Sequence, residues 1–334
     1  MNLKPPAIFL FLFSPLVGEV LLGSTTISHI YLFPLQVFLY GSGAMLIREI
    51  LFLKGFSWVR VMLLGVAFAL IEEGLADQSI FNPHYLGADN ILQYGRWIGV
   101  NWYWAEYLIG WHAIWSITLP ILTTTLLFPS YRNTTWMAQD GVRGLIMIFV
   151  CSCIGTFGYT LYITGGFIAT WSQLVIILLV ITLIVNLALN VPEPIRTNGQ
   201  VEIPTPKLLL VMLGITAFVG GFVWLGNHDF VISRFTALSI IGTQIVFVIL
   251  VFGILVGIRH FAGYQHSWNL KQLGAIASGG LLGGAAGGIV IVQGDGILDM
   301  VGQIMLCVIT MAFIVFLNVR IDNTVKKAGI KEMP

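Results

Sequence analysis

Long stretches without a charged residue divide this chain, and their lengths restrict its fold more than any other feature. There are 24 uncharged residues between Arg234 and Arg259, 23 between Lys271 and Asp295, and 20 between Asp299 and Arg320. A helix that crosses a bilayer needs about 20 predominantly apolar residues. Only 9% of the residues are charged, against roughly 25% in average soluble domains. The sequence therefore predicts an all-α, polytopic integral membrane helix bundle.

Hydrophobic stretches of this length predict about ten transmembrane helices. The 49 uncharged residues from 144 to 192 are broken by a Thr-Gly-Gly turn at 164–166, so they are read as two spans. The runs are continuously apolar rather than alternating, which disfavours transmembrane β-strands. The predicted spans are 6–24, 29–48, 58–79, 103–128, 142–163, 169–192, 207–226, 235–258, 272–293 and 298–319.

The basic residues predict the orientation of these spans. With a cytoplasmic N-terminus, 14 of the 16 Lys and Arg residues fall on the cytoplasmic side, and only Arg96 and Arg234 fall outside. Such a bias is the positive-inside signal of multi-pass membrane proteins. We expect both termini inside, a location in the cell (plasma) membrane, and the lipid bilayer as the main partner. The net charge of +1 argues against nucleic acid as a partner.

The chain is expected to form one membrane domain, 1–334, with an internal division. A proline-containing loop at 192–206 separates a six-helix unit, 1–192, from a four-helix unit, 207–320. The ninth span carries small-xxx-small ladders between Gly279 and Gly288. Such ladders let helix backbones approach closely. They indicate packing, either inside one subunit or between two copies as a homo-oligomer.

The outer loop before the fourth span is rich in tryptophan. Trp97, Trp102 and Trp104 stand close together there, and tryptophans at this level usually form an interfacial belt. The alternative is a re-entrant cap over a site, because a non-helical backbone is allowed where it lines a cavity. The belt is the favoured interpretation.

Four ionisable residues inside predicted spans indicate chemistry: Glu19, Glu72, Glu73 and His112. An ionisable side chain in hydrocarbon is costly and usually functional. With a rise of about 1.5 Å per residue, all four residues are expected about 10 Å below the outer surface of the membrane. This common depth predicts a shared pocket. Three neighbours are expected to support it: Asp77, one turn from Glu73; Ser116, one turn from His112; and Glu106, near the mouth.

A Glu/His pair of this kind predicts activation of water, with Glu72, Glu73 and His112 as catalytic residues. The glutamate acts directly as a base or through a divalent metal held at Glu73 and His112. The alternative is structural, because polar residues in spans often join helices through hydrogen bonds. Tandem glutamates favour the functional interpretation, since adjacent helical residues point about 100° apart and both avoid lipid only in a crowded interior.

Two resemblances follow from these residues. The segments Tyr40–Gly43, Leu46–Glu49, Ile71–Gly74, Gln78–Pro83 and His112–Ile117 resemble a bacterial family of multi-pass membrane proteins over roughly the first 145 residues. The Glu-Glu pair and the later His also resemble, more distantly, the CAAX-protease and bacteriocin-processing superfamily of glutamate intramembrane proteases. That resemblance implies Glu72 or Glu73 as general base, His112 as the second-motif histidine, and a membrane protein or peptide as substrate.

The chain departs from the superfamily pattern at three places. Asp77 stands where the first motif has Arg, Leu108 stands where the second has Phe, and the fifth and sixth spans lack the third-motif His. Three functions therefore stay open: an intramembrane hydrolase, a transporter that couples a small molecule to protons or cations, and a non-catalytic scaffold on a protease-like fold. Loss of activity on removal of Glu73 or His112 separates the first from the third.

Overall fold

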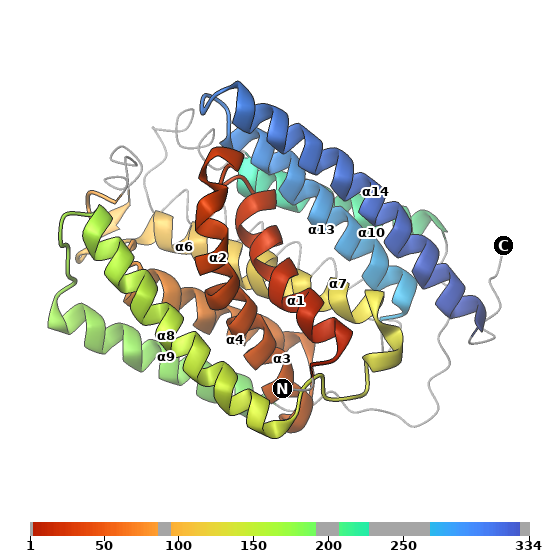
Figure 1. Ribbon diagram of the computed structural model, residues 1–334, viewed down its shortest axis with the longest axis horizontal. Helices are drawn as coiled ribbons and strands as arrows, with labels where there is room; N and C mark the ends of the chain where they lie inside the picture. Colours follow the sequence, from red (N-terminus) through yellow and green to blue (C-terminus); the bar gives the residue numbers. More distant parts are fainter. Residues whose placement is uncertain (1–2, 86–94, 192–206, 227–267, 328–334) are drawn as a thin grey trace. The chain divides into compact units, whose positions relative to one another are not determined.

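The computed structural model describes residues 3–85, 95–191, 207–226 and 268–327 (Figure 1). The predicted span 235–258 lies outside the described residues. The chain divides into two compact units. The first unit comprises Met1–Gly18, Leu32–Ile121 and Thr134–Pro194, and the second comprises Glu19–Tyr31, Leu122–Asn133 and Ile195–Pro334. Two short stretches near residues 25 and 128 join the second unit, and the predicted division into 1–192 and 207–320 stays a prediction.

The first unit is helical, and several of its helices contain π-helical turns. The α-helices are α1 (Pro5–Pro15), α2 (Phe33–Gln36), α3 (Ser42–Lys54), α4 (Trp58–Ile71), α6 (Trp102–Trp111), α8 (Gln139–Ile163) and α9 (Trp171–Asn190). The π-helical segments are η3 (Val37–Gly41), η4 (Glu72–Ala76) and η5 (His112–Thr118). The chain passes between the units within the π-helical η1 (Leu16–Leu21) and within α7 (Leu119–Leu127). Within the first unit, α4 packs against both η5 and α9.

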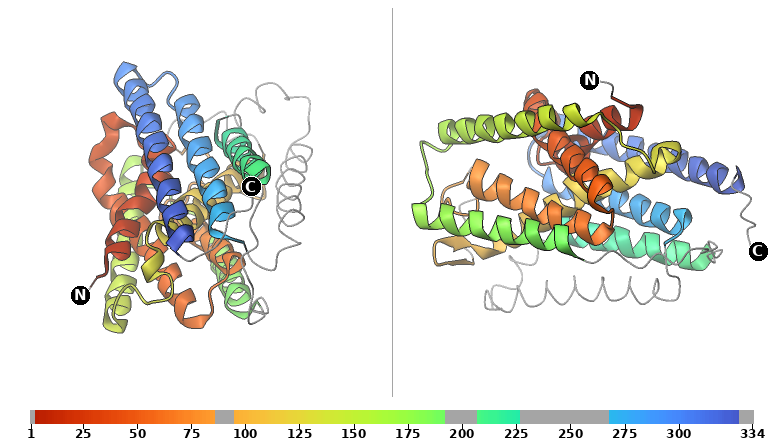
Figure 2. Two further views of the ribbon diagram at one scale, coloured as in Figure 1. Left: turned by 90° about the vertical axis from the view of Figure 1, so that its right-hand side faces the viewer. Right: turned by 90° about the horizontal axis from the view of Figure 1, so that it is seen from below.

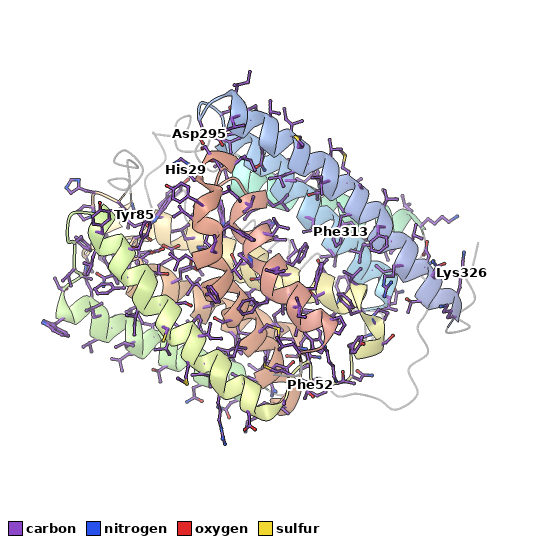
Figure 3. All side chains as sticks on the ribbon, viewed as in Figure 1. His29, Phe52, Tyr85, Asp295, Phe313 and Lys326 are labelled. Atoms are coloured by element: carbon purple, nitrogen blue, oxygen red, sulfur yellow. The ribbon has the colours of Figure 1, made fainter. Side chains whose placement is uncertain are left out.

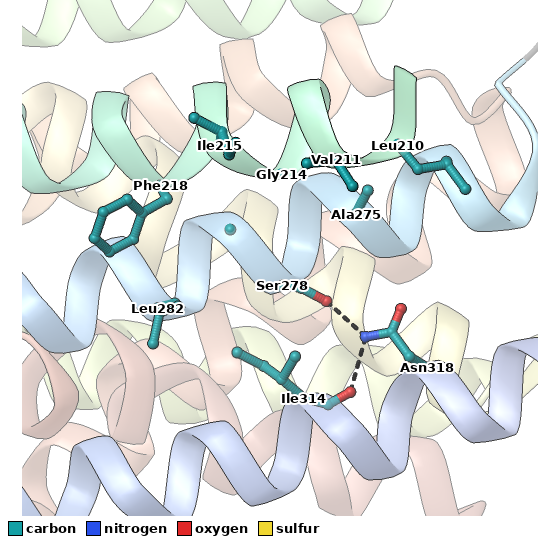
Figure 4. Close-up of a pocket in the computed structure, with 11 residues that line it drawn as sticks. Leu210, Val211, Gly214, Ile215, Phe218, Ala275, Ser278, Leu282, Ile314 and Asn318 are labelled. Carbon is teal, nitrogen blue, oxygen red and sulfur yellow. Dashed lines mark hydrogen bonds between the residues drawn. The ribbon is translucent and has the colours of Figure 1, made fainter. Parts of the chain in front are cut away.

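Among its described residues, the second unit contains three long helices and two short 3₁₀ segments. The long helices are α10 (Lys207–Gly226), α13 (Leu270–Ile291) and α14 (Ile297–Lys327), and the 3₁₀ segments are η2 (Ile27–Leu32) and η6 (Pro129–Tyr131). Helix α13 packs against both α10 and α14 (Figure 2). An open, mainly apolar pocket of about 480 Å³ lies among these three helices, bordered by a hydrogen bond from Asn318 to Ser278 (Figure 4).

The glycines of α13 allow its close approach to α10. A Cβ atom at Gly279 would collide with the backbone carbonyl of Gly214, and one at Gly283 would lie 2.6 Å from the carbonyl oxygen of Phe218. Glycine is needed here because backbone, rather than a movable side chain, occupies the space. The glycine surface thus packs inside one chain, which was one of the two predicted uses. A homo-oligomer through Gly279–Gly288 stays a prediction.

Five helices of the described residues are long and apolar enough to cross a membrane: Ile27–Lys54, Asp140–Ile163, Trp171–Asn190, Leu270–Ile291 and Ile297–Lys327. Many apolar side chains of α8, α9 and α14 point outward and are exposed (Figure 3). In a soluble protein such surfaces would be costly, whereas a bilayer solvates them. The chain is therefore an all-α membrane protein. Ten crossings and the orientation of the termini stay predictions.

A buried ion pair holds the middle of α3 to the segment before α8. Arg48 donates to the neighbouring Glu49, and both side chains are buried. Arg48 also donates to the Thr134 carbonyl at 2.8 Å and lies 3.8 Å from the centre of the Trp136 ring, while Glu49 accepts from the Trp136 backbone N–H at 3.0 Å. Each buried charge is therefore paired and hydrogen-bonded, as its burial requires.

Among the described residues the one sheet is a hairpin in the segment between α4 and α6. Strand β1 (Arg96–Trp97) pairs antiparallel with β2 (Val100–Asn101), with Arg96 opposite Asn101 and Trp97 opposite Val100. The hairpin directly precedes α6. It therefore lies next in the chain to the helix that carries the candidate histidine.

Candidate functional site

Two helices of the first unit change to π-helical geometry at the predicted site residues. Helix α4 begins at its N-cap Ser57, which accepts from the Arg60 N–H, and it becomes η4 at Glu72. Helix α6 becomes η5 at His112. A π turn re-aims the side chains that follow it, and such turns occur frequently at functional sites.

The two helices lie close together because a glycine stands at the point where they meet. A Cβ atom at Gly65 of α4 would lie 2.9 Å from the Ala113 carbonyl oxygen and 3.0 Å from the Ala113 Cα atom. Any larger residue at position 65 would push η5 away from α4. Gly65 thus sets the distance over which the side chains of η4 and η5 reach each other.

His112 makes the central contacts of the site. Its Nε2 lies 2.9 Å from Oε1 of Glu73, and its Nδ1 lies 3.0 Å from Oγ of Ser116 and 3.5 Å from Oε2 of Glu72. All four side chains are buried. The imidazole therefore has a carboxylate near each ring nitrogen. The structure brings together the three predicted catalytic residues and one predicted supporting residue, Ser116.

The other carboxylate oxygen of Glu73 is held by a residue that the sequence did not identify. Ser79 donates its hydroxyl hydrogen to Oε2 of Glu73, and the indole Nε1–H of Trp104 donates to Oγ of Ser79 at 3.2 Å. Ser79 is fully buried. Ser79 is the last residue of the predicted span 58–79, and its contact with Glu73 follows no helical spacing because the helix itself ends at Ala76.

The end of this helix explains how Ser79 reaches Glu73. Gln78 has φ +53°, in the left-handed region that is uncommon for residues other than glycine. Its carbonyl accepts from the N–H groups of Phe81 and Asn82, and its side-chain Oε1 accepts from the Ala169 N–H at 2.7 Å. The left-handed turn reverses the chain, so that Ser79 faces back toward Glu73.

Aromatic rings surround the imidazole. The centre of the His112 ring lies 5.7 Å from that of Tyr40, 6.4 Å from that of Phe68 and 6.5 Å from that of Trp111. These rings lower the local dielectric, which strengthens the electrostatic interaction between His112 and the carboxylates.

Ser116 is tightly enclosed by α1 and the turn that follows it. Ser14 donates to the Ser116 carbonyl at 2.6 Å, and a Cβ atom at Gly18 would collide with Oγ of Ser116. Trp111 Nε1–H also donates to the Gly18 carbonyl at 2.7 Å. Because there is no space for a substrate at its hydroxyl, Ser116 fits the orientation of His112 rather than nucleophilic attack.

The remaining predicted residues are placed as follows. Asp77 accepts from the Thr160 hydroxyl at 2.7 Å, and one oxygen each from Glu72, Glu73 and Asp77 lie within 4.8 Å of one another. Glu106 is partly buried in α6, six residues before His112. Glu19 belongs to the second unit and accepts from the Thr25 hydroxyl at 3.3 Å. Its membership of the shared pocket stays a prediction.

The carboxylate and imidazole atoms of the site can be compared with the ligands that a metal ion needs. A contact of 2.9 Å between His112 and Glu73 is a hydrogen-bond distance, so the two groups satisfy each other without an ion. The three carboxylates Glu72, Glu73 and Asp77 fit oxygen-preferring cations such as Mg²⁺ or Ca²⁺ better. The three carboxylates therefore offer a set of cation ligands, and a divalent metal at Glu73 and His112 stays a prediction.

The segment between α4 and α6, which lies beside the site, is folded back and fixed by Arg96. The guanidinium donates to the carbonyl oxygens of Phe81 at 2.9 Å and Asn82 at 3.1 Å, and the Asn101 N–H donates to the Ile80 carbonyl at 2.9 Å. Partial burial lowers the pKa of Arg96 below its ordinary value. The stretch after Ser79 is therefore buried, as expected of a cap, whereas Trp97 and Trp102 are exposed, as expected of a belt.

Comparison with known proteins adds a family without a described activity. No curated protein matches the chain, and no solved structure matches it. One family model, described as an uncharacterized membrane protein family, matches residues 8–260, a range that includes Glu72, Glu73 and His112. Since the match covers most of the sequence, the chain belongs to this uncharacterized membrane protein family.

Proposed function

We propose that the first unit is a membrane-embedded hydrolase, with Glu73 as general base and His112 as its proton-exchanging partner. The observation that carries the proposal is the buried Glu73–His112 pair, whose imidazole also contacts Ser116 and Glu72. Carboxylate and imidazole side chains are the usual general bases and acids of enzymes. The favoured substrate is a peptide bond in or at the membrane, in keeping with the resemblance of the Glu-Glu and His motifs.

In this proposal each residue has a separate role. Glu73 removes a proton from water as the water oxygen bonds to the substrate carbonyl carbon, and His112 delivers a proton to the leaving amine as the C–N bond breaks. The proton on Glu73 then returns to His112, which restores the starting state. Ser79 and Ser116 orient the pair, and Glu72 stabilises the imidazolium form of His112, which is the starting state and persists until the amine takes its proton.

A second candidate is a transporter coupled to protons or cations. The observation in its favour is the close group of carboxylates from Glu72, Glu73 and Asp77 on one helix end. Acidic groups inside membranes commonly mark ion pathways and proton relays. Transport would depend on the three carboxylates, whereas hydrolysis would depend on Glu73 and His112 together.

The hydrolase is tested by mapping protein termini in membranes from cells that make the wild type, Glu73→Gln or His112→Ala. We expect new termini that appear with the wild type and are lost with both variants at equal protein levels. Asp140→Asn is the control, because it removes a carboxylate whose side chain is 94% exposed and so leaves no buried charge without its partner. Termini that persist in both site variants would exclude hydrolysis by this pair.

Reconstitution in liposomes tests the second candidate. A transporter would move protons or cations in response to an imposed gradient, and Asp77→Asn would reduce that flux. Absence of flux under pH and cation gradients, together with unchanged termini, leaves a non-catalytic scaffold as the remaining function.

A further inference from the structure

The hairpin β1–β2 places two large apolar side chains in the open. Trp97 is 68% exposed and Ile98 is 71% exposed, and Trp102 at the start of α6 is exposed beside them. The loop of the hairpin consists of Ile98 and Gly99, with φ +50° and +71°. A two-residue loop with both φ angles positive favours Asn-Gly. A β-branched residue at the first position is a backbone outlier. The turn therefore does not explain why this position holds isoleucine.

The hairpin lies at the level where a candidate membrane-spanning helix begins. The Gln173 side chain, in the first turn of α9, donates to the Gly99 carbonyl at 2.8 Å. Two residues earlier, Trp171 is 84% exposed, and Ile168 and Tyr162 are exposed on the preceding turn and the end of α8. The exposed surface of the hairpin is therefore continuous with the apolar outer surface of α9.

The exposed rings are held in place by bonds to the hairpin and the buried segment. Trp102 Nε1–H donates to the Trp97 carbonyl at 3.1 Å, and Arg96 at the base of the hairpin donates to the Phe81 carbonyl. The hairpin is thus fixed against the first unit, while the side chains of Trp97 and Ile98 stay exposed. An apolar tip that is already held in one conformation loses little conformational freedom when it enters a bilayer.

We propose that the hairpin tip inserts into the interfacial region of the bilayer, and we name its surface, formed by Trp97, Ile98, Trp102 and Trp171, the interfacial surface. Tryptophan is enriched at membrane–water interfaces because its ring is apolar and its N–H is polar. Lipid is the occupant favoured by continuity with α9, whose outward side chains Ile176 and Leu179 are also exposed. The strained Ile98 then contributes apolar contact with acyl chains, where asparagine would not.

Site-specific labelling tests the insertion. The three native cysteines are replaced, Ile98→Cys is labelled with an environment-sensitive fluorophore, and the full chain is placed in nanodiscs made with or without brominated lipid. We expect quenching by brominated lipid and protection from aqueous iodide. Asp140→Cys is the control, because its side chain is 94% exposed and charged at the opposite end of α8; its probe should respond to iodide alone. A second label at Trp97→Cys repeats the measurement if Ile98→Cys folds poorly.

Each outcome decides the proposal. Quenching of the position-98 or position-97 probe by brominated lipid supports insertion. Quenching by iodide alone would show that the tip lies in water. Protection from both quenchers would show that another protein or a second copy covers the tip. Either of the last two results overturns the assignment to lipid, and neither bears on hydrolysis by Glu73 and His112.

Discussion

The Nε2 atom of His112 lies 2.9 Å from the Oε1 atom of Glu73, although 39 positions separate the two residues in the chain. The contact joins the ends of two helices that both change to π geometry at the residues concerned. It selects Glu73 from the tandem glutamates as the partner of Nε2 and leaves Glu72 near Nδ1.

Replacement of Ser79 by alanine should weaken the hold on Glu73. The buried carboxylate oxygen and the Trp104 N–H both lose their partner, and an unsatisfied buried polar group costs about 1–3 kcal/mol. We expect a lower midpoint of thermal unfolding in detergent and a loss of any activity that depends on Glu73. Ser152→Ala is the matched control, because Ser152 is also buried but bonds only to the Ile148 carbonyl of its own helix. Equal effects of the two substitutions would argue against a special role for Ser79.

Replacement of Gly65 by alanine should separate α4 from η5. The new methyl group meets the backbone of Ala113, and overpacking of this kind costs about 1–3 kcal/mol. The measurement is the thermal midpoint together with the ring-proton NMR signals of His112, which should shift as the Glu73 contact lengthens. Gly158→Ala is the control, because within the described part of the chain a Cβ atom at that position meets nothing within 4 Å beyond the neighbouring backbone of α8. An unchanged His112 signal in Gly65→Ala would contradict the prediction.

Replacement of Arg48 by methionine should destabilise the first unit. Glu49 would keep its buried charge without its partner, and breaking a buried pair typically costs about 3–5 kcal/mol. Thermal unfolding of the purified protein measures the loss. The matched substitution Arg143→Met removes an arginine from a solvent-exposed pair with Asp140, and exposed pairs contribute little. A stable Arg48→Met protein would mean that Glu49 finds another hydrogen-bond partner.

Replacement of Ile98 by asparagine separates backbone strain from membrane contact. Asparagine tolerates positive φ far better than isoleucine, so the thermal midpoint in detergent should stay equal or rise. In bilayers the same substitution should reduce quenching of a probe at Trp97→Cys by brominated lipid. A marked fall in the detergent midpoint would show that Ile98 packs against protein instead.

Several features of the fold and the site followed from local sequence. Uncharged stretches of about 20 residues predicted a helical membrane protein, because a backbone in hydrocarbon must satisfy its own hydrogen bonds. Glu72, Glu73 and His112 stood out because ionisable residues are rare in such stretches. Ser79 did not, since a serine after a helix is common and its contact depends on the left-handed turn at Gln78.

The sequence by itself determined the class of protein and the residue types of the candidate site, because both depend on the free energy of transfer between water and hydrocarbon, which acts locally. Tertiary structure decided which glutamate meets which ring nitrogen, that Ser79 and Trp104 hold Glu73, and that the glycines of α13 face α10. Those outcomes depend on π turns and on the close approach of helices distant in the chain. Such geometry arises only when the helices pack.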